Sequence, residues 1–232
     1  MIEAEWWEYD DADEWAEAVA GDVGFLIDQA LDARGNAIVA FPGGPIPEPV
    51  FALLAKSTRK WKHVTIIPTD ERLVPLTDKS SNARMLAQHF LPAGARVLPL
   101  YGGTISDPAG AARAASDTLA DMHWPLDLVW LGVGDDGHTA SIFPGPDYDE
   151  ALTTPHRVVG VTPDPMPKDA PVARISLSKS AILSARAITI TLTGPKSRAA
   201  LERALEDGDS ATTPVGRVLA DASQAIDIHW AP

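Results

Sequence analysis

The stretch LDLVWLGVGDDGHTASIFPG, residues Leu126–Gly145, joins an apolar run to a loop that contains three glycines. The apolar part, Leu126–Gly132, has the length of a strand and is mostly continuous rather than alternating, which is typical of a strand buried on both faces of a sheet. The loop reads Gly-x-Gly-x-x-Gly, the pattern of a dinucleotide-binding turn. Asp135, Asp136 and His138 in the same loop suggest instead acid–base chemistry at the end of a strand.

Further strand candidates lie on both sides of this stretch, and amphipathic segments separate most of them. The strand candidates are Ala37–Phe41, Val64–Thr69, Arg96–Leu100, Val158–Thr162, Arg174–Leu177, Ile188–Thr193 and Ile226–Trp230. The helical patterns are Asp11–Ala33, Pro49–Lys56, Asn82–Phe90, Pro108–Met122 and Lys196–Glu206. Alternation of strand and helix predicts an α/β fold with a doubly wound, mostly parallel sheet and helices on both faces.

The chain is expected to form one domain over residues 1–232, with the residues before about position 10 only loosely attached. The later strands follow one another closely, so part of the sheet is expected to be mixed. The residues of the acidic Trp-rich start, MIEAEWWEYDDADEW, show neither the basic nor the apolar region of a signal peptide.

Composition narrows the classes of function. The 232 residues include 32 acids and 19 lysines and arginines, a net charge of −13, and 45% are hydrophobic. This balance argues against nucleic acid and anionic membrane surfaces as partners, but a few clustered cations can still hold a small anion. Cysteine is absent, which excludes disulfides and thiolate metal sites. No apolar run reaches the ~20 residues that span a bilayer, so we expect a cytoplasmic protein.

The glycine loop fits a dinucleotide poorly. Asp135 and Asp136 would repel a diphosphate, and the motif comes past the middle of the chain rather than in its first strand–helix unit. In the alternative interpretation His138 takes a proton from water and Asp136 fixes its tautomer. A third interpretation is structural, in which His138 caps a turn and Asp136 only shapes the loop.

Two other strand ends carry comparable groups. After Ala37–Phe41 comes PGGPIPEP, where Gly43 and Gly44 let backbone amides approach a ligand. The other interpretation of this segment is an ordinary Gly–Pro turn. After Val64–Thr69 comes DERLVP, in which Asp70 and Arg72 either contact a ligand or form an ion pair that orders the loop.

Cations also lie near two predicted helix starts. Asn82 and Arg84 begin the helix after DERLVP, and Lys196 and Arg198 follow Gly194 in GPKSRAAL. A cation at a helix N-terminus opposes the helix dipole, so a bound anion would account for it; a solvated surface is the other interpretation. No metal site is expected, because the remaining histidines fall on separate segments without acidic partners at ligand spacing: His63, His89, His123, His156 and His229.

The blocks LDLVWLGVGDDGHTASIFPG, PTDERLVP, SNARML, PGG and LTGPKSRAALERALED together resemble the short bacterial 6-phosphogluconolactonases, relatives of the glucosamine-6-phosphate deaminases. The resemblance implies a Rossmann-like sheet that uses no dinucleotide or other cofactor and hydrolyses 6-phospho-D-glucono-1,5-lactone to 6-phosphogluconate. It also implies that His138 activates water. Asp136 would then orient His138, with the amides of Gly43–Gly44 or Gly134–Gly137 at the developing oxyanion.

The expected substrate contacts follow from the same comparison. Arg72 and one of Lys196 or Arg198, with preference for Arg198, would hold the phosphate, and Asp70 would bind sugar hydroxyls. The partner is a small molecule, and a monomer or small homo-oligomer is expected.

This sequence also departs from the family pattern. Pro42, Pro45 and Ile46 replace three hydroxyl residues of the first loop, and the usual lysine after the Thr-Gly turn is Ser197. The deaminases typically have a glutamate in Gly-His-Ile-Ala-Phe-Asn-Glu-Pro, and it is missing after His138 here, which favours a lactonase. The alternatives are a deaminase-like isomerase and a non-catalytic sugar-phosphate binder.

Overall fold

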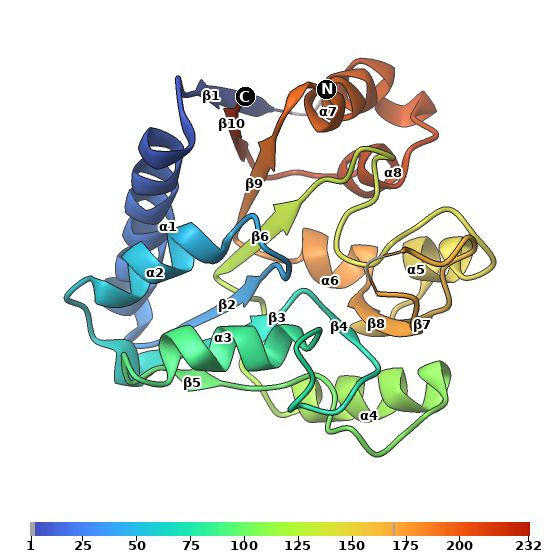
Figure 1. Cartoon of the computed structure of the whole chain (residues 1–232), viewed down its shortest axis with the longest axis horizontal. Coiled ribbons are helices and arrows are strands. Elements are labelled where there is room, and N and C mark those ends of the chain that lie inside the picture. The colour runs from blue at the N-terminus through green and yellow to red at the C-terminus, as the bar shows by residue number, and fades with distance from the viewer. Residues whose placement is uncertain (1–2, 169) are drawn as a thin grey trace.

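The computed structural model describes residues 3–168 and 170–232, and seven strands of this part form one sheet (Figure 1). All neighbouring strands in it are parallel, which confirms the prediction of a parallel sheet. The strands in spatial order are β1 (Ala4–Glu8), β10 (Ile226–Ala231), β9 (Ala187–Thr193), β6 (Leu128–Gly132), β2 (Ala37–Phe41), β3 (Val64–Pro68) and β5 (Arg96–Val97).

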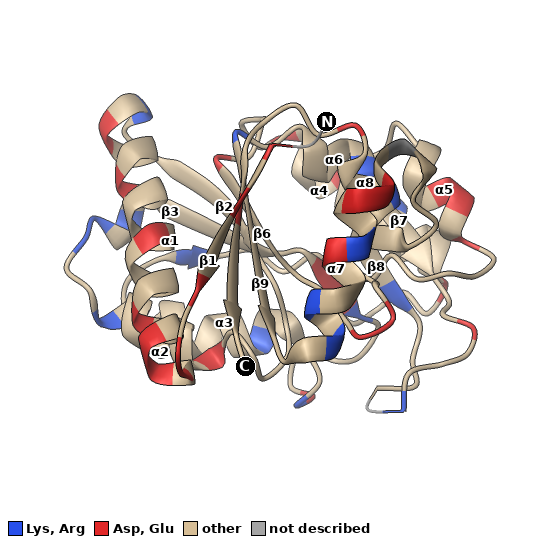
Figure 2. Ribbon diagram, turned by 90° about the horizontal axis from the view of Figure 1, so that it is seen from above, with Lys and Arg blue, Asp and Glu red and all other residues tan. Residues whose placement is uncertain are grey.

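Helices cover both faces of this sheet, as Figure 2 shows, so the doubly wound arrangement is confirmed. One face carries α1 (Ala12–Arg34), α2 (Glu48–Lys56) and α3 (Asn82–Phe90). The other face carries α4 (Pro108–Ala120), α5 (Tyr148–Thr153), α6 (Lys179–Leu183), α7 (Pro195–Asp207) and α8 (Pro214–Leu219). Two 3-10 turns are η1 (Trp61–His63) and η2 (Gly208–Ser210). In the described part of the chain, no helix combines the length and apolar character needed to cross a membrane.

The strand residues alternate between two cores. In β2, Val39 and Phe41 pack with α1, α2 and α3, whereas Ile38 and Ala40 pack with the helices on the opposite face. This alternation follows from the two-residue period of a strand, and it explains why β2 is apolar throughout. Phe41 lies 5.4 Å from the ring of Trp130, centroid to centroid.

Residues Ala4–Glu8 are not loosely attached, which contradicts the prediction for the chain before about position 10. Strand β1 pairs in parallel with β10 at the edge of the sheet, from Ala4 opposite Ile226 to Glu8 opposite Trp230. An edge strand is partly solvated, so the segment AEWWE mixes polar and apolar residues. Because it lacks a continuous apolar run, its sequence did not predict a strand. Its Trp6 lies against Arg198 of α7.

The expected mixed part of the sheet is a separate small sheet. Strands β4 (Asp70–Arg72), β8 (Arg174–Leu177) and β7 (Val158–Val161) pair antiparallel in the order β4-β8-β7. Because β4 follows β3 directly, this arrangement carries the residues after β3 across to β8.

The order of the strands creates a crevice. From β2 the chain moves outward through β3 and β5 and then returns to β6 on the other side of β2. The loops that follow β2, β3 and β6 therefore meet at the carboxyl edge of the sheet, where open α/β sheets bind their ligands.

Candidate active site

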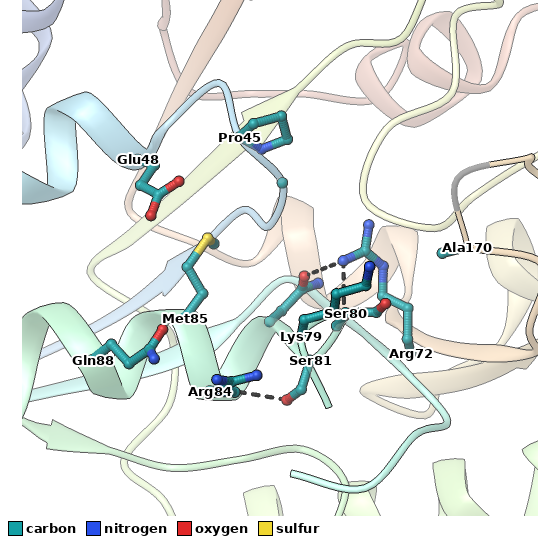
Figure 3. Close-up of a pocket in the computed structure, with 12 residues that line it drawn as sticks. Pro45, Glu48, Arg72, Lys79, Ser80, Ser81, Arg84, Met85, Gln88 and Ala170 are labelled. Carbon is teal, nitrogen blue, oxygen red and sulfur yellow. Dashed lines mark hydrogen bonds between the residues drawn. The ribbon is translucent and has the colours of Figure 1, made fainter. Parts of the chain in front are cut away.

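A cavity of about 270 Å³ opens at this crevice. Its lining comes from the loops after β2, β3 and β6 and from β8 and β9, and it includes Gly43, Gly44, Asp70, Arg72, His138 and Arg174. A second cavity of about 370 Å³ shares Gly44, Arg72 and Asn82 with the first and extends along the start of α3 (Figure 3). Ligand sites typically occupy about 300–1,000 Å³, so the two adjoining cavities together suit a small phosphorylated sugar.

His138 and Asp136 form a close pair at one end of this space. The Nδ1 atom of His138 lies 2.5 Å from Oδ1 of Asp136, and the ring stacks on Phe143 with centroids 4.4 Å apart. The hydrogen bond from His138 holds the pKa of the Asp136 carboxyl below its usual value. An ionised Asp136 accepts the Nδ1 proton, which leaves Nε2 with a free lone pair, the arrangement of a general base.

The turn around His138 is held by other groups. The N–H of Gly134 donates to the carbonyl of His138, the N–H of Gly137 donates to the carbonyl of Gly134, and the Thr139 hydroxyl donates to the carbonyl of Gly132. The imidazole takes no part in these bonds. Oδ1 of Asp136 also accepts the backbone N–H of His138, so Asp136 shapes this loop as well as contacting the ring.

Gly134 makes room for the imidazole. A Cβ atom at this position would lie 2.2 Å from Cε1 and 2.3 Å from Nδ1 of His138, distances that side-chain carbons do not tolerate. Gly137, with φ of 78°, supplies the left-handed residue of the turn. A dinucleotide fingerprint requires a helix directly after its glycines, but in the described chain the next helix after Gly137 is α5. These glycines therefore serve the histidine turn rather than a pyrophosphate.

Arg72 and Asn82 form the opposite wall. The Nη1 atom of Arg72 donates to Oδ1 of Asn82 at 2.6 Å and to the carbonyl of Ser80 at 3.0 Å. Gly43 lies close against this pair, because a Cβ there would come within 2.0 Å of the Asn82 oxygen. The Nε atom of Arg72 is buried and has no hydrogen-bond partner among the described residues.

Asp70 makes internal contacts instead of an ion pair with Arg72. Its Oδ2 accepts a 2.5 Å hydrogen bond from Ser141, and its Oδ1 accepts bonds from the side chains of Thr69 and Asn82. Since Ser141 follows the His138 turn, Asp70 ties that turn to the Arg72 wall.

Glu71 organises the same wall from inside. Its two carboxylate oxygens accept hydrogen bonds from the backbone N–H groups of Arg72, Asn82 and Ala83, and from the hydroxyl of Ser81. Burial raises the pKa of this carboxyl, and those backbone bonds act in the opposite direction. Glu71 thus fixes the start of α3 relative to β4.

Arg174 also lines the 270 Å³ cavity, although its sequence context did not predict a site residue. It lies opposite Arg72 in the β4–β8 pairing, is only 4% exposed, and its guanidinium sits 5.2 Å from the ring of Phe143. Like charges placed directly opposite on neighbouring strands are unfavourable unless another group compensates them. An arginine at the first position of a short buried strand was the signal available in the sequence.

The remaining predicted residues lie in three different places. Arg84 lines the second cavity and donates through Nη1 to the carbonyl of Thr77. The exposed Lys196 lies 3.9 Å from Asp135, beside the His138 loop. Arg198 does not line either cavity: it pairs with Glu8 and Glu202 and stacks on two tryptophans. The preference for Arg198 over Lys196 as a phosphate ligand therefore finds no support in the geometry.

A metal ion has no evident binding set in residues 3–168 and 170–232, since no three His, Asp or Glu side chains gather at ligand distance.

Comparisons with known proteins agree on one family. Residues 10–230 match the family model described as glucosamine-6-phosphate isomerases/6-phosphogluconolactonase. A protein of Rhizobium meliloti (strain 1021) named 6-phosphogluconolactonase is 37% identical over 223 residues, which cover 94% of each chain. One of Caulobacter vibrioides with the same name is 38% identical over 87% of this chain and 86% of its own.

Solved structures give the same result. The crystal structure of a 6-phosphogluconolactonase from Shewanella baltica superposes with a TM-score of 0.91 at 33% identity and covers 99% of this chain and 98% of its own. A monomeric glucosamine-6-phosphate deaminase, 17% identical with a TM-score of 0.78, shares the fold.

Proposed function

The chain belongs to the family of glucosamine-6-phosphate isomerases and 6-phosphogluconolactonases, and we propose that it is a lactonase of this family. It hydrolyses 6-phospho-D-glucono-1,5-lactone to 6-phospho-D-gluconate, the second step of the oxidative pentose phosphate pathway. The observation that carries this proposal is the His138–Asp136 pair, whose imidazole lines one cavity with Arg72. Hydrolysis of a phosphorylated lactone requires a base and a residue that binds the phosphate, and both must face the same cavity.

His138 is the general base. Its Nε2 takes a proton from water while the water oxygen attacks the lactone carbonyl carbon, and Asp136 stabilises the imidazolium that forms. The tetrahedral intermediate then collapses, the bond from this carbon to the ring oxygen breaks, and the imidazolium returns its proton to that oxygen. The lactone is an activated ester, so no covalent nucleophile is needed. A well-placed base accelerates such a step by about 10²–10⁴.

The amides of Gly43 and Gly44 stabilise the oxyanion. The N–H groups of Gly134 and Gly137 already donate to carbonyls within the histidine turn, which removes them as donors. Gly43 and Gly44 line the same cavity, and no hydrogen bond from their N–H groups to a described residue is present. Preorganised backbone donors of this kind are each worth about 10²–10³ in rate.

The phosphate binds at Arg72, which lines both cavities. Arg84 lies at the same end of the site, and Lys196 lies beside the His138 loop without lining either cavity. Holding the phosphate makes the attack effectively intramolecular. Asp70 acts through Ser141 and Asn82 rather than on sugar hydroxyls.

The test is a lactonase assay on freshly prepared substrate, coupled to phosphogluconate dehydrogenase. The protein should raise the rate far above spontaneous hydrolysis, and Arg72→Ala should raise KM. Release of ammonia from glucosamine 6-phosphate, or no acceleration of lactone hydrolysis, would overturn the proposal in favour of the isomerase or the non-catalytic binder.

We also propose that residues 1–232 act as one domain, as a monomer or small homo-oligomer in the cytoplasm, with the sugar phosphate as the only partner. Strands β10, β9, β6, β2 and β3 of the central sheet contribute residues to both cores, which supports a single folding unit.

A further inference from the structure

The 370 Å³ cavity beside the catalytic cavity carries three cationic side chains on one wall. Arg72 comes from β4, Lys79 from the loop that follows, and Arg84 from the first turn of α3. Figure 3 shows the three on the same side of the cavity, with Glu48 of α2 across from them.

None of these cations forms an ion pair with a residue in 3–168 or 170–232. The nearby acid Asp78 accepts a 2.8 Å hydrogen bond from the N–H of Ser80, and this bond, together with the charges of Lys79 and Arg84, holds the pKa of its carboxyl below the usual value. Glu48, across the cavity, lies 3.6 Å from His89. Three positive groups that face one cavity on a protein of net charge −13 create a local field that attracts an anion.

The facing loop supplies few polar groups. Pro42, Pro45 and Ile46 occupy the first loop where the family resemblance leads us to expect hydroxyls, and Pro45 lines this cavity. The opposite wall has Lys79, Ser80 and Ser81 instead. Ser80 and Ser81 already bond to Asp78 and Glu71, so Lys79 is the side chain of this segment that can contact an anion.

We propose that Lys79 is a phosphate-binding residue of this chain and that the phosphate of the substrate lies between Arg72, Lys79 and Arg84. The inference rests on the proposed lactonase function and names the subsite of its phosphate. Arg72 belongs to both cavities, so it marks the point where the sugar in the first meets the phosphate in the second. Lys79 contributes a mobile point charge, whereas Arg72 supplies directed N–H donors.

The experiment compares Lys79→Gln with Lys62→Gln. Both lysines are exposed and both changes remove one positive charge, but Lys62 lies in η1 and lines neither cavity. Isothermal titration with 6-phosphogluconate and with gluconate separates binding of the phosphate from binding of the sugar acid. Lys79→Arg tests whether charge alone suffices.

We expect Lys79→Gln to weaken 6-phosphogluconate binding about tenfold, the effect of one charge-assisted contact that is partly screened by solvent. KM for the lactone should rise by a similar factor with kcat within about twofold. Lys62→Gln should match the wild type, and Lys79→Arg should restore most of the affinity.

Two results would overturn the inference. One is unchanged 6-phosphogluconate affinity in Lys79→Gln, and the other is an equal loss of affinity for gluconate, which would place the effect outside the phosphate. The titration needs no turnover, so a wild-type protein that binds 6-phosphogluconate without hydrolysing the lactone would refute the proposed function and leave the subsite standing.

Discussion

Replacement of Gly134 by alanine tests the position of the catalytic imidazole without removing it. The new Cβ would lie 2.2 Å from Cε1 of His138, whereas ordinary contacts begin at 3.4 Å. The ring must therefore move by about 1.2 Å, the difference between these two distances. A displacement of about 1 Å in a catalytic group costs on the order of 10²-fold in rate, equivalent to about 2.7 kcal/mol in activation free energy.

The assay is steady-state lactone hydrolysis, and Gly21→Ala provides the control. Gly21 lies in α1 with open space around its Cβ position, so alanine there should leave kcat unchanged and stabilise the helix by roughly 0.5–1 kcal/mol. Gly134→Ala should lower kcat about 100-fold and keep affinity for 6-phosphogluconate within a few-fold. A Gly134→Ala enzyme with wild-type kcat would show that the position of this ring does not limit catalysis.

Three further predictions concern the groups around the site and the edge of the sheet. Asp136→Asn should lower kcat by about 10²-fold or more, because an amide does not favour the Nδ1-protonated tautomer of His138; wild-type kcat would exclude that orienting role. Arg198→Ala should lower the melting temperature by roughly 2–4 °C, the effect of losing about 1 kcal/mol of stacking on Trp6 and Trp230, with KM unchanged; a large rise in KM would place Arg198 at the phosphate after all. Burial holds the pKa of His229 below its usual 6.5, so the unfolded chain binds more protons just below that pH and the free energy of unfolding falls as the pH drops through it. His229→Gln should flatten this slope in denaturant titrations between about pH 5 and 7, and an unchanged slope would mean that other groups cause it.

Most strands of the central sheet could be predicted from the sequence because they are apolar and parallel. Leu126–Gly132 and Ala37–Phe41 are buried on both faces, and buried parallel strands have a continuous apolar pattern. Strand β1 gave no such signal. Its sequence AEWWE looks like an acidic tail, and only its pairing with β10 shows that it is an edge strand.

The candidate site was predictable where a residue follows a strand end. His138 and Arg72 follow β6 and β3 in the chain, and these strands lie on either side of β2, so the topology brings both residues to one cavity. Arg174 and Lys79 required tertiary information, because their place depends on the pairing of β4 with β8 and on the path of the loop before α3. The ion pair of Arg198 with Glu8 could not be predicted from the sequence, because these residues meet only through the pairing of β1 and the packing of α7.

The role of His138 as the base that activates water is tested most directly by His138→Ala. With fresh lactone, kcat should fall by at least about 100-fold, while 6-phosphogluconate should raise the melting temperature of the variant as much as that of the wild type. Retention of wild-type kcat in a variant that still binds 6-phosphogluconate would contradict the account.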